Sequence, residues 1–221
     1  MKKILLEEFK KILKEKYFFH FHTTYTDGLS NVREYFDFAF RHNIYTIIFT
    51  EHVRKKMSYN FNEFLEEIKK SKISYPGIKI IIGAEAKIMP GGELDISEEV
   101  LDKIQLICFA CHSFPDNADL YFESFKKLFF NKRWEDYIRI WVHPGRFLKK
   151  NNLFKEYEKN FVDLLQIAKK RDIFIENNLR EQLPPFNIIS FFDNQNTIIG
   201  FDIHSVEEIK KYEGNIIINP N

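Results

Sequence analysis

Seven short apolar segments alternate along the chain with longer segments of helical periodicity, and this alternation is the feature that most constrains the fold. The apolar segments cover residues 17–23, 45–52, 78–85, 105–112, 138–145, 172–178 and 197–204. Between them, stretches such as FNEFLEEIKKS repeat apolar residues at spacings of three and four, as amphipathic helices do. Because the apolar segments are almost continuous, both faces of their sheet must be covered, which predicts parallel strands with helices outside.

Polar side chains collect where the apolar segments end. Of the seven histidines, only His42 falls in a predicted helix, whereas the others close a predicted strand: His20, His22, His52, His112, His143 and His204. Glu85 and Asp202 hold equivalent positions. An open doubly wound sheet also fits the alternation, but side chains from many strand ends meet at one point only when the sheet closes. We therefore predict an α/β fold of the TIM-barrel type, with a site at the C-terminal ends of the strands.

Length and composition narrow the class of protein. The 221 residues suit a single domain over 1–221, with residues 1–16 as an amphipathic helix packed on it. A net charge of +1 gives no overall attraction to nucleic acid, and no stretch approaches the roughly 20 apolar residues that would span a membrane. Cys108 and Cys111 lie three apart in one apolar segment and so face opposite sides of a strand. We expect two free buried thiols and a cytoplasmic location.

Spacing at the first and last strands indicates a metal site. His20 and His22 share one face of a regular strand about 7 Å apart, close enough to reach one ion. Asp202 and His204 repeat this spacing on the last strand, which neighbours the first in a closed barrel. For any single histidine here, a hydrogen-bonded core or surface residue is the better explanation. Together, however, so many buried polar groups without partners would each cost a few kcal/mol, roughly, and metal ions would remove that cost.

An ordered set of short motifs carries a family resemblance. HFH with TDG, then TEH, GAE, CHS, HPGR and FDIHS together resemble the polymerase and histidinol phosphatase (PHP) superfamily, over about residues 17–212. PGGELD and IENN are similar to that family as well. The resemblance implies a distorted (β/α)7 barrel with a trinuclear metal centre.

The resemblance also implies three groups of metal ligands. One ion would take His20, His22, Glu85 and Asp202, a second would share Glu85 and take His112 and His143, and a third would take Asp27, His52 and His204. Nine ligands at about three per open catalytic site agree with up to three divalent ions. Imidazoles and carboxylates without thiolate suit zinc, manganese or iron, and the residues do not choose among these metals.

These ligands predict a hydrolase that acts on an anionic substrate, because three divalent ions outweigh the charge of three carboxylates. We predict a metal-dependent phosphoesterase that hydrolyses a small phosphorylated metabolite, in the manner of histidinol phosphatase, through a hydroxide bridging the ions. The predicted catalytic residues are Glu85, Asp202 and His204. Arg146 and Arg180 follow strand ends and are predicted to bind the phosphate, although a solvated loop arginine explains each equally well.

Other readings of the sequence stay open. Glu51, next to His52, is predicted either to support the ligands from behind or to form a simple buried ion pair. A nuclease acting on nucleotide phosphodiesters is an alternative that the near-zero net charge disfavours. A catalytically silent metal-binding scaffold is another, which the complete ligand set disfavours. No membrane partner is predicted, and the sequence makes no prediction of oligomeric state.

Overall fold

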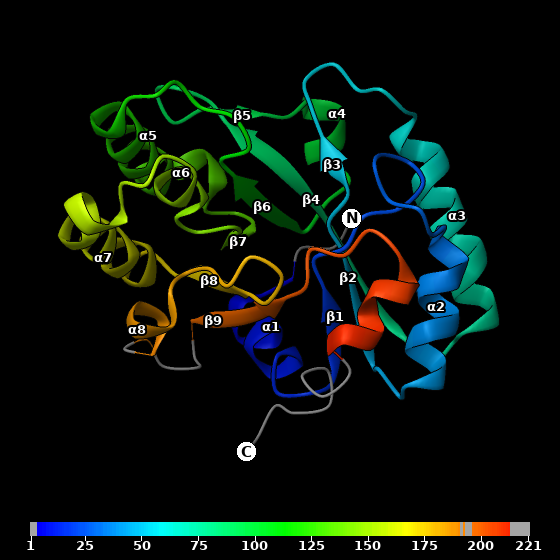
Figure 1. Cartoon of the computed structure of the whole chain (residues 1–221). Helices are drawn as coiled ribbons and strands as arrows, with labels where there is room; N and C mark the ends of the chain where they lie inside the picture. Colours follow the sequence, from blue (N-terminus) through cyan, green and yellow to red (C-terminus); the bar gives the residue numbers. More distant parts are fainter. Residues whose placement is uncertain (1–3, 191, 193–195, 213–221) are drawn as a thin grey trace.

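In the computed structural model, which describes residues 4–190, 192 and 196–212, seven parallel strands form a nearly closed barrel with helices around it (Figure 1). Each strand pairs in parallel with the next, in an order that follows the chain. They are β1 (Tyr17–Phe19), β2 (Thr46–Phe49), β4 (Lys79–Ile88), β6 (Leu106–Ala110), β7 (Ile138–Trp141), β8 (Ile173–Asn178) and β9 (Thr197–Gly200). The distorted (β/α)7 barrel is thereby confirmed.

Closure of the barrel occurs just beyond β1 and β9. Phe21 and Ile203 form a parallel bridge there, and the amide of His22 donates to the Ile203 carbonyl at 2.9 Å. The first and last strands are therefore neighbours, as predicted. The sequence did not indicate two short strands, β3 (His52–Val53) and β5 (Leu94–Asp95), which both pair with the long β4.

The main helices occupy the predicted segments between strands. They are α2 (Val32–Arg41), α3 (Phe61–Ser74), α5 (Ala118–Phe130) and α7 (Phe154–Lys170). Asn31, Asn60 and Asn117 each cap the start of one of the first three by accepting from a backbone amide. Shorter helical turns complete the outer layer: α4 (Glu98–Leu101), η1 (Lys132–Trp134), α6 (Arg146–Lys150), α8 (Phe186–Ile189) and η2 (Val206–Tyr212).

The N-terminal helix is shorter than predicted. Of the residues 1–16, the first three lie outside the described residues, and α1 covers only Leu6–Ile12. A turn at residues 13–15 then connects α1 to β1. Phe9 and Ile12 of α1 pack with inward-facing strand residues such as Phe174, so that α1 closes the N-terminal end of the barrel.

Two apolar clusters follow from the alternation of side chains along each strand. The cluster inside the barrel contains Cys108 and Ile140, whereas the larger cluster between strands and helices contains Trp141 and Cys111. Both cysteines are buried and free, as expected. The interior near α1 is thus apolar, and the polar residues that follow the strands are left to the C-terminal end.

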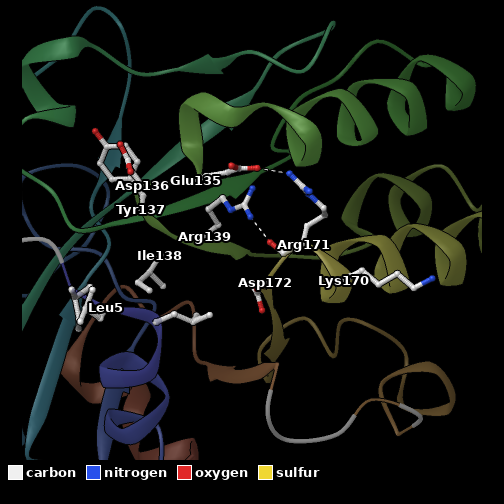
Figure 2. Close-up of a pocket in the computed structure, with 11 residues that line it drawn as sticks. Leu5, Glu135, Asp136, Tyr137, Ile138, Arg139, Lys170, Arg171 and Asp172 are labelled. Carbon is white, nitrogen blue, oxygen red and sulfur yellow. Dashed lines mark hydrogen bonds and ion pairs between the residues drawn. The ribbon is translucent and has the colours of Figure 1, made fainter.

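A buried arginine lies at the N-terminal end of the barrel, on the outer face of β7 (Figure 2). The Arg139 guanidinium donates to the Phe129 carbonyl at 3.3 Å and to the Arg171 carbonyl. These carbonyls belong to the C-terminal ends of α5 and α7, where the negative ends of two helix dipoles favour a cation. A cavity of about 490 Å³, bordered also by Leu5 and Asp172, lies beside this arginine.

Candidate metal centre

The predicted ligands reach the C-terminal end of the barrel from loops that leave the strands abruptly. His20, His143 and Asp202 have φ angles of 63°, 48° and 49°, a left-handed conformation that is uncommon for residues other than glycine. β1 already ends at Phe19 and β9 at Gly200. The reason predicted for the convergence of His20 and His22, a regular strand period, is therefore wrong. A left-handed turn redirects the chain, and both imidazoles still point to one place.

The first group surrounds one oxygen each of Glu85 and Asp202. Glu85 Oε2 lies 3.5 Å from Nε2 of His20 and 3.3 Å from Nε2 of His22. Asp202 Oδ1 lies 3.6 Å from the same two nitrogens. All four side chains are buried, so four ligand atoms face one small volume.

The other oxygen of Glu85 faces a second group. Glu85 Oε1 lies 2.8 Å from His112 Nε2 and 3.7 Å from His143 Nε2. Glu85 can therefore serve two ions at once, one at each carboxylate oxygen.

Asp27 forms the centre of a third group, on the more exposed side of the site. Its Oδ2 lies 3.5 Å from Nε2 of His52 and 3.5 Å from Nε2 of His204. The structure thus brings together all nine side chains singled out in the sequence. Among the described residues, each of the nine belongs to at least one cluster of three that could hold an ion.

The spacing within these groups suits metal ions better than hydrogen bonds. Most of the separations are 3.3–3.7 Å, longer than the 2.7–3.2 Å, roughly, of an N–H···O hydrogen bond. A tetrahedral ion with bonds of about 2.0–2.1 Å holds its ligand atoms about 3.3–3.4 Å apart. The facing atoms also lack hydrogen-bond partners, although they are buried: both Glu85 oxygens and Nε2 of His20, His22, His112 and His143. These residues fit divalent cations.

Comparison with known proteins agrees with this geometry. The family model of the PHP domain matches residues 19–180. This chain belongs to the PHP family. Among curated proteins, the DNA polymerase/3'-5' exonuclease PolX of Bacillus subtilis (strain 168) is 23% identical over 200 residues, which are 85% of this chain and 34% of that protein. The PHP chain therefore spans about a third of the length of this relative.

Solved structures share the PHP fold. Histidinol phosphate phosphatase of Lactococcus lactis subsp. lactis Il1403, complexed with zinc, L-histidinol and phosphate, superposes with a TM-score of 0.66 at 18% identity, covering 93% of this chain and 95% of that one. A two-domain protein of Bacteroides vulgatus ATCC 8482, which contains a predicted PHP-like metal-dependent phosphoesterase, gives a TM-score of 0.53 at 19% identity. That match covers 90% of this chain and 55% of the other. Within the described residues, no helix is both long and apolar enough to cross a membrane.

Charges in the PHP site stabilise one another. Burial opposes ionisation of Glu85, but the imidazoles of His112 and His52 hold the pKa of this carboxyl well below its usual range. Burial also disfavours a charged His20, yet Glu176 and Glu85 raise the pKa of this imidazole to about 10. A divalent cation would replace such protons as the partner of the carboxylates, because a ligating histidine must be neutral.

A carboxylate that sequence reasoning missed, Glu176, holds two ligands of the PHP site in place. It is fully buried on β8 and accepts from Nδ1 of His20, from the amide of His143 at 2.7 Å and from the Asn178 side chain at 3.1 Å. The IENN motif contains this residue, and the alternation of β8 places it on the inner face with Phe174. Glycine at position 200 leaves room for this carboxylate, since a Cβ there would lie 1.9 Å from Glu176 Oε1.

Glu51 performs a similar task on the other side of the site. Its buried carboxylate accepts from the amide of Thr23 at 2.9 Å and from the hydroxyls of Thr23 and Thr26. Glu51 Oε1 also lies 3.6 Å from Nδ1 of His22. Glu51 therefore lies behind His22 and fixes the loop that carries Asp27, which fits the predicted supporting role better than an isolated ion pair.

The two predicted phosphate-binding arginines lie at the rim of the PHP site. Nη1 of Arg146 lies 2.9 Å from Nδ1 of His112, and its other terminal nitrogen pairs with Glu181. Nη1 of Arg180 lies 2.7 Å from Nδ1 of His204 and donates to the Asp202 carbonyl at 2.6 Å. Both side chains are partly exposed. Each guanidinium thus touches a predicted ligand and also meets solvent.

Proposed function

We infer that this PHP-family protein is a metal-dependent hydrolase that cleaves a small phosphate monoester. The observation that carries this inference is the buried Glu85 carboxylate, which faces two groups of unpartnered imidazole nitrogens while two arginines lie at the rim. The superposition on a histidinol phosphate phosphatase, a structure that contains zinc and phosphate, supports a substrate of that kind.

The ligand groups would hold up to three divalent ions, of zinc, manganese or iron. By their pairwise distances, His20, His22, Glu85 and Asp202 would hold the first, Glu85 with His112 and His143 the second, and Asp27 with His52 and His204 the third. Bound ions would acidify a water molecule and polarise the phosphoryl oxygens. Histidine and carboxylate ligands without a thiolate are compatible with each of these metals.

The protein's own residues would orient the substrate. Arg180 is held at the rim through Nη1 and Arg146 through both terminal nitrogens, and each could turn its remaining N–H groups toward oxygens of a phosphate. Glu85, Asp202 and His204 would act as catalytic residues by fixing the ions against the reacting phosphate. Glu176 and Glu51 would keep His20 and His22 in their orientations.

A nuclease is the second candidate. The similarity to a DNA polymerase/3'-5' exonuclease favours it, although this chain corresponds to only 34% of that protein. The net charge of +1 argues against a long nucleic-acid track, which usually requires a basic surface.

The deciding experiment compares metal content and turnover. The protein, reconstituted with zinc, manganese or iron, is assayed on a panel of phosphorylated metabolites, histidinol phosphate among them, and on a short oligonucleotide at increasing salt. Hydrolysis of a monoester supports the proposal, and salt-sensitive cleavage of the oligonucleotide alone supports the nuclease. Bound metal without hydrolysis of any ester would instead support a scaffold.

The arginines have a separate test. Arg146→Ala and Arg180→Ala should each raise KM for the preferred ester, because each removes a charge-assisted contact to phosphate. Unchanged Michaelis constants in both variants would disprove the phosphate-binding role.

A further inference from the structure

A cavity of about 590 Å³ opens beside the metal centre. Three predicted ligands, Asp27, His52 and His112, line one side of it. The remaining lining comes from the loop after β1 and from the loop between β3 and α3. A substrate whose phosphate lies on the ligands would extend its organic part into this cavity.

Part of the cavity lining offers ring and thioether surface. This part, called the aromatic wall, consists of Tyr25, Met57 and Tyr59, and the hydroxyl residues Thr26 and Ser58 also line the cavity. The hydroxyl of Tyr59 already donates to the His52 carbonyl at 3.0 Å. Burial and the neighbouring Glu67 raise the pKa of Tyr25 to about 12, which keeps its hydroxyl neutral. The side chains are therefore aromatic and thioether contacts for whatever enters.

The two rings are held in place before any ligand binds. The ring centroids of Tyr25 and Tyr59 lie 5.6 Å apart, and Phe64 of α3 packs on both at 5.3 Å and 6.3 Å. Such edge-to-face and tilted contacts fix the ring planes, so that little conformational freedom is lost on binding.

Charge in the cavity is nearly balanced. Arg54 borders it, but its Nε lies 3.7 Å from an Asp95 oxygen and its Nη1 donates to the Val53 carbonyl at 2.7 Å. The wall therefore selects for shape and aromatic surface more than for the charge of the ligand.

We propose that this cavity is a leaving-group pocket for phosphate esters whose organic part carries a planar ring, which packs on Tyr59 and Tyr25. The proposal rests on the proposed function and deepens it by naming the substrate class. A volume of about 590 Å³ accommodates a ring system of the size of a nucleoside, since ligand pockets span roughly 300–1,000 Å³. Stacking on a fixed aromatic wall strengthens binding by about tenfold per ring.

The test uses two phosphonates that share a headgroup and cannot be hydrolysed. Binding of phenylphosphonate and methylphosphonate to the metal-reconstituted protein is measured by isothermal titration calorimetry. The phenyl compound should bind about tenfold more tightly. Tyr59→Leu should abolish this preference, whereas Tyr59→Phe, which keeps the ring, should retain it. Tyr45→Leu, the same change at an exposed tyrosine that does not line the cavity, is the matched control and should also retain it.

Equal affinity for both phosphonates in the unsubstituted protein would overturn the pocket, as would a preference that survives Tyr59→Leu. Turnover of phenyl phosphate and glycerol phosphate separates this failure from failure of the proposed function. Hydrolysis of both esters with equal kcat/KM and no phosphonate preference refutes the pocket alone. A phosphonate preference without hydrolysis of any ester refutes the function and leaves the pocket standing.

Discussion

At the N-terminal end of the barrel, the buried Arg139 guanidinium is met by protein groups, whereas at the C-terminal end the buried Glu85 carboxylate faces imidazole nitrogens without hydrogen-bond partners. The Arg139 guanidinium donates to carbonyls at the C-terminal ends of two helices, so protein groups compensate its charge; Figure 2 shows the contact with the Arg171 carbonyl. Glu85 Oε2 lies 3.5 Å from Nε2 of His20 and 3.3 Å from Nε2 of His22, longer than most hydrogen bonds. Buried charge therefore supports structure at one end and points to a ligand at the other.

The largest effect should come from Glu85→Gln. The amide keeps the size of the side chain but removes the charge that two ligand groups share, so we expect at least about a thousandfold loss of phosphoesterase activity, about 4 kcal/mol. Bound metal, measured by atomic emission, should fall as well. Asp172→Asn makes the same change at the other end of the barrel, at a φ of 52° that asparagine tolerates, and should change neither quantity. Normal metal content in Glu85→Gln would contradict the assignment.

Removal of metal should destabilise the protein strongly. An ion present at about a thousand times its dissociation constant contributes about 4 kcal/mol, so a chelator should lower Tm by about 10 °C or more. Calorimetry before and after addition of chelator, and after readdition of the ion, measures this change. A melting temperature that does not change with chelator would mean that the buried ligand side chains at the C-terminal end of the barrel need no ions for stability.

Arg139→Met should destabilise the fold by about 2–3 kcal/mol, because two helix-terminal carbonyls lose their cationic donor. The decrease in Tm should be the same with and without metal, and the metal content should not change. Arg139→Lys keeps the charge but cannot reach both carbonyls as a guanidinium does. Its Tm should therefore lie between those of the unsubstituted protein and Arg139→Met. A Tm of Arg139→Met equal to that of the unsubstituted protein would show that Arg139 does not stabilise the N-terminal end of the barrel.

Glu176→Gln should weaken metal binding by about 10- to 100-fold, since it loosens His20 and the His143 loop without removing a ligand. Competition with a chromophoric chelator measures the affinity. Gly200→Ala should act in the same direction by displacing the Glu176 carboxylate, whereas Gly77→Ala, with no atom within 4 Å of the new Cβ, is the control. An unchanged metal affinity in both Glu176→Gln and Gly200→Ala would show that Glu176 does not hold the ligands in place.

The strands and the main helices could be predicted because their signals are local. All seven predicted strands are present, and α2, α3, α5 and α7 occupy the predicted segments. The N-terminal helix was predicted too long, since nothing local marks the turn that connects α1 to β1. The short strands β3 and β5 were not predicted, because two residues are too few to show a periodic pattern and both strands form by pairing with β4.

The supporting carboxylates were harder to foresee than the predicted ligands. Glu51 stood out beside a predicted ligand, whereas Glu176 lies 156 positions from His20 and is linked to it only by the closure of the barrel. The left-handed turns at His20 and Asp202 could not be predicted either, because the surrounding fold, and not the residue type, stabilises this conformation.

By itself, the sequence determined which side chains end the strands, and with them the type of fold and the chemical identity of the predicted ligands. The tertiary structure decided which of those side chains share a carboxylate, which protein groups hold them from behind and which cavity opens beside them. The reason is physical: the period of a strand is local, but distances between different strand ends exist only once the first and last strands meet.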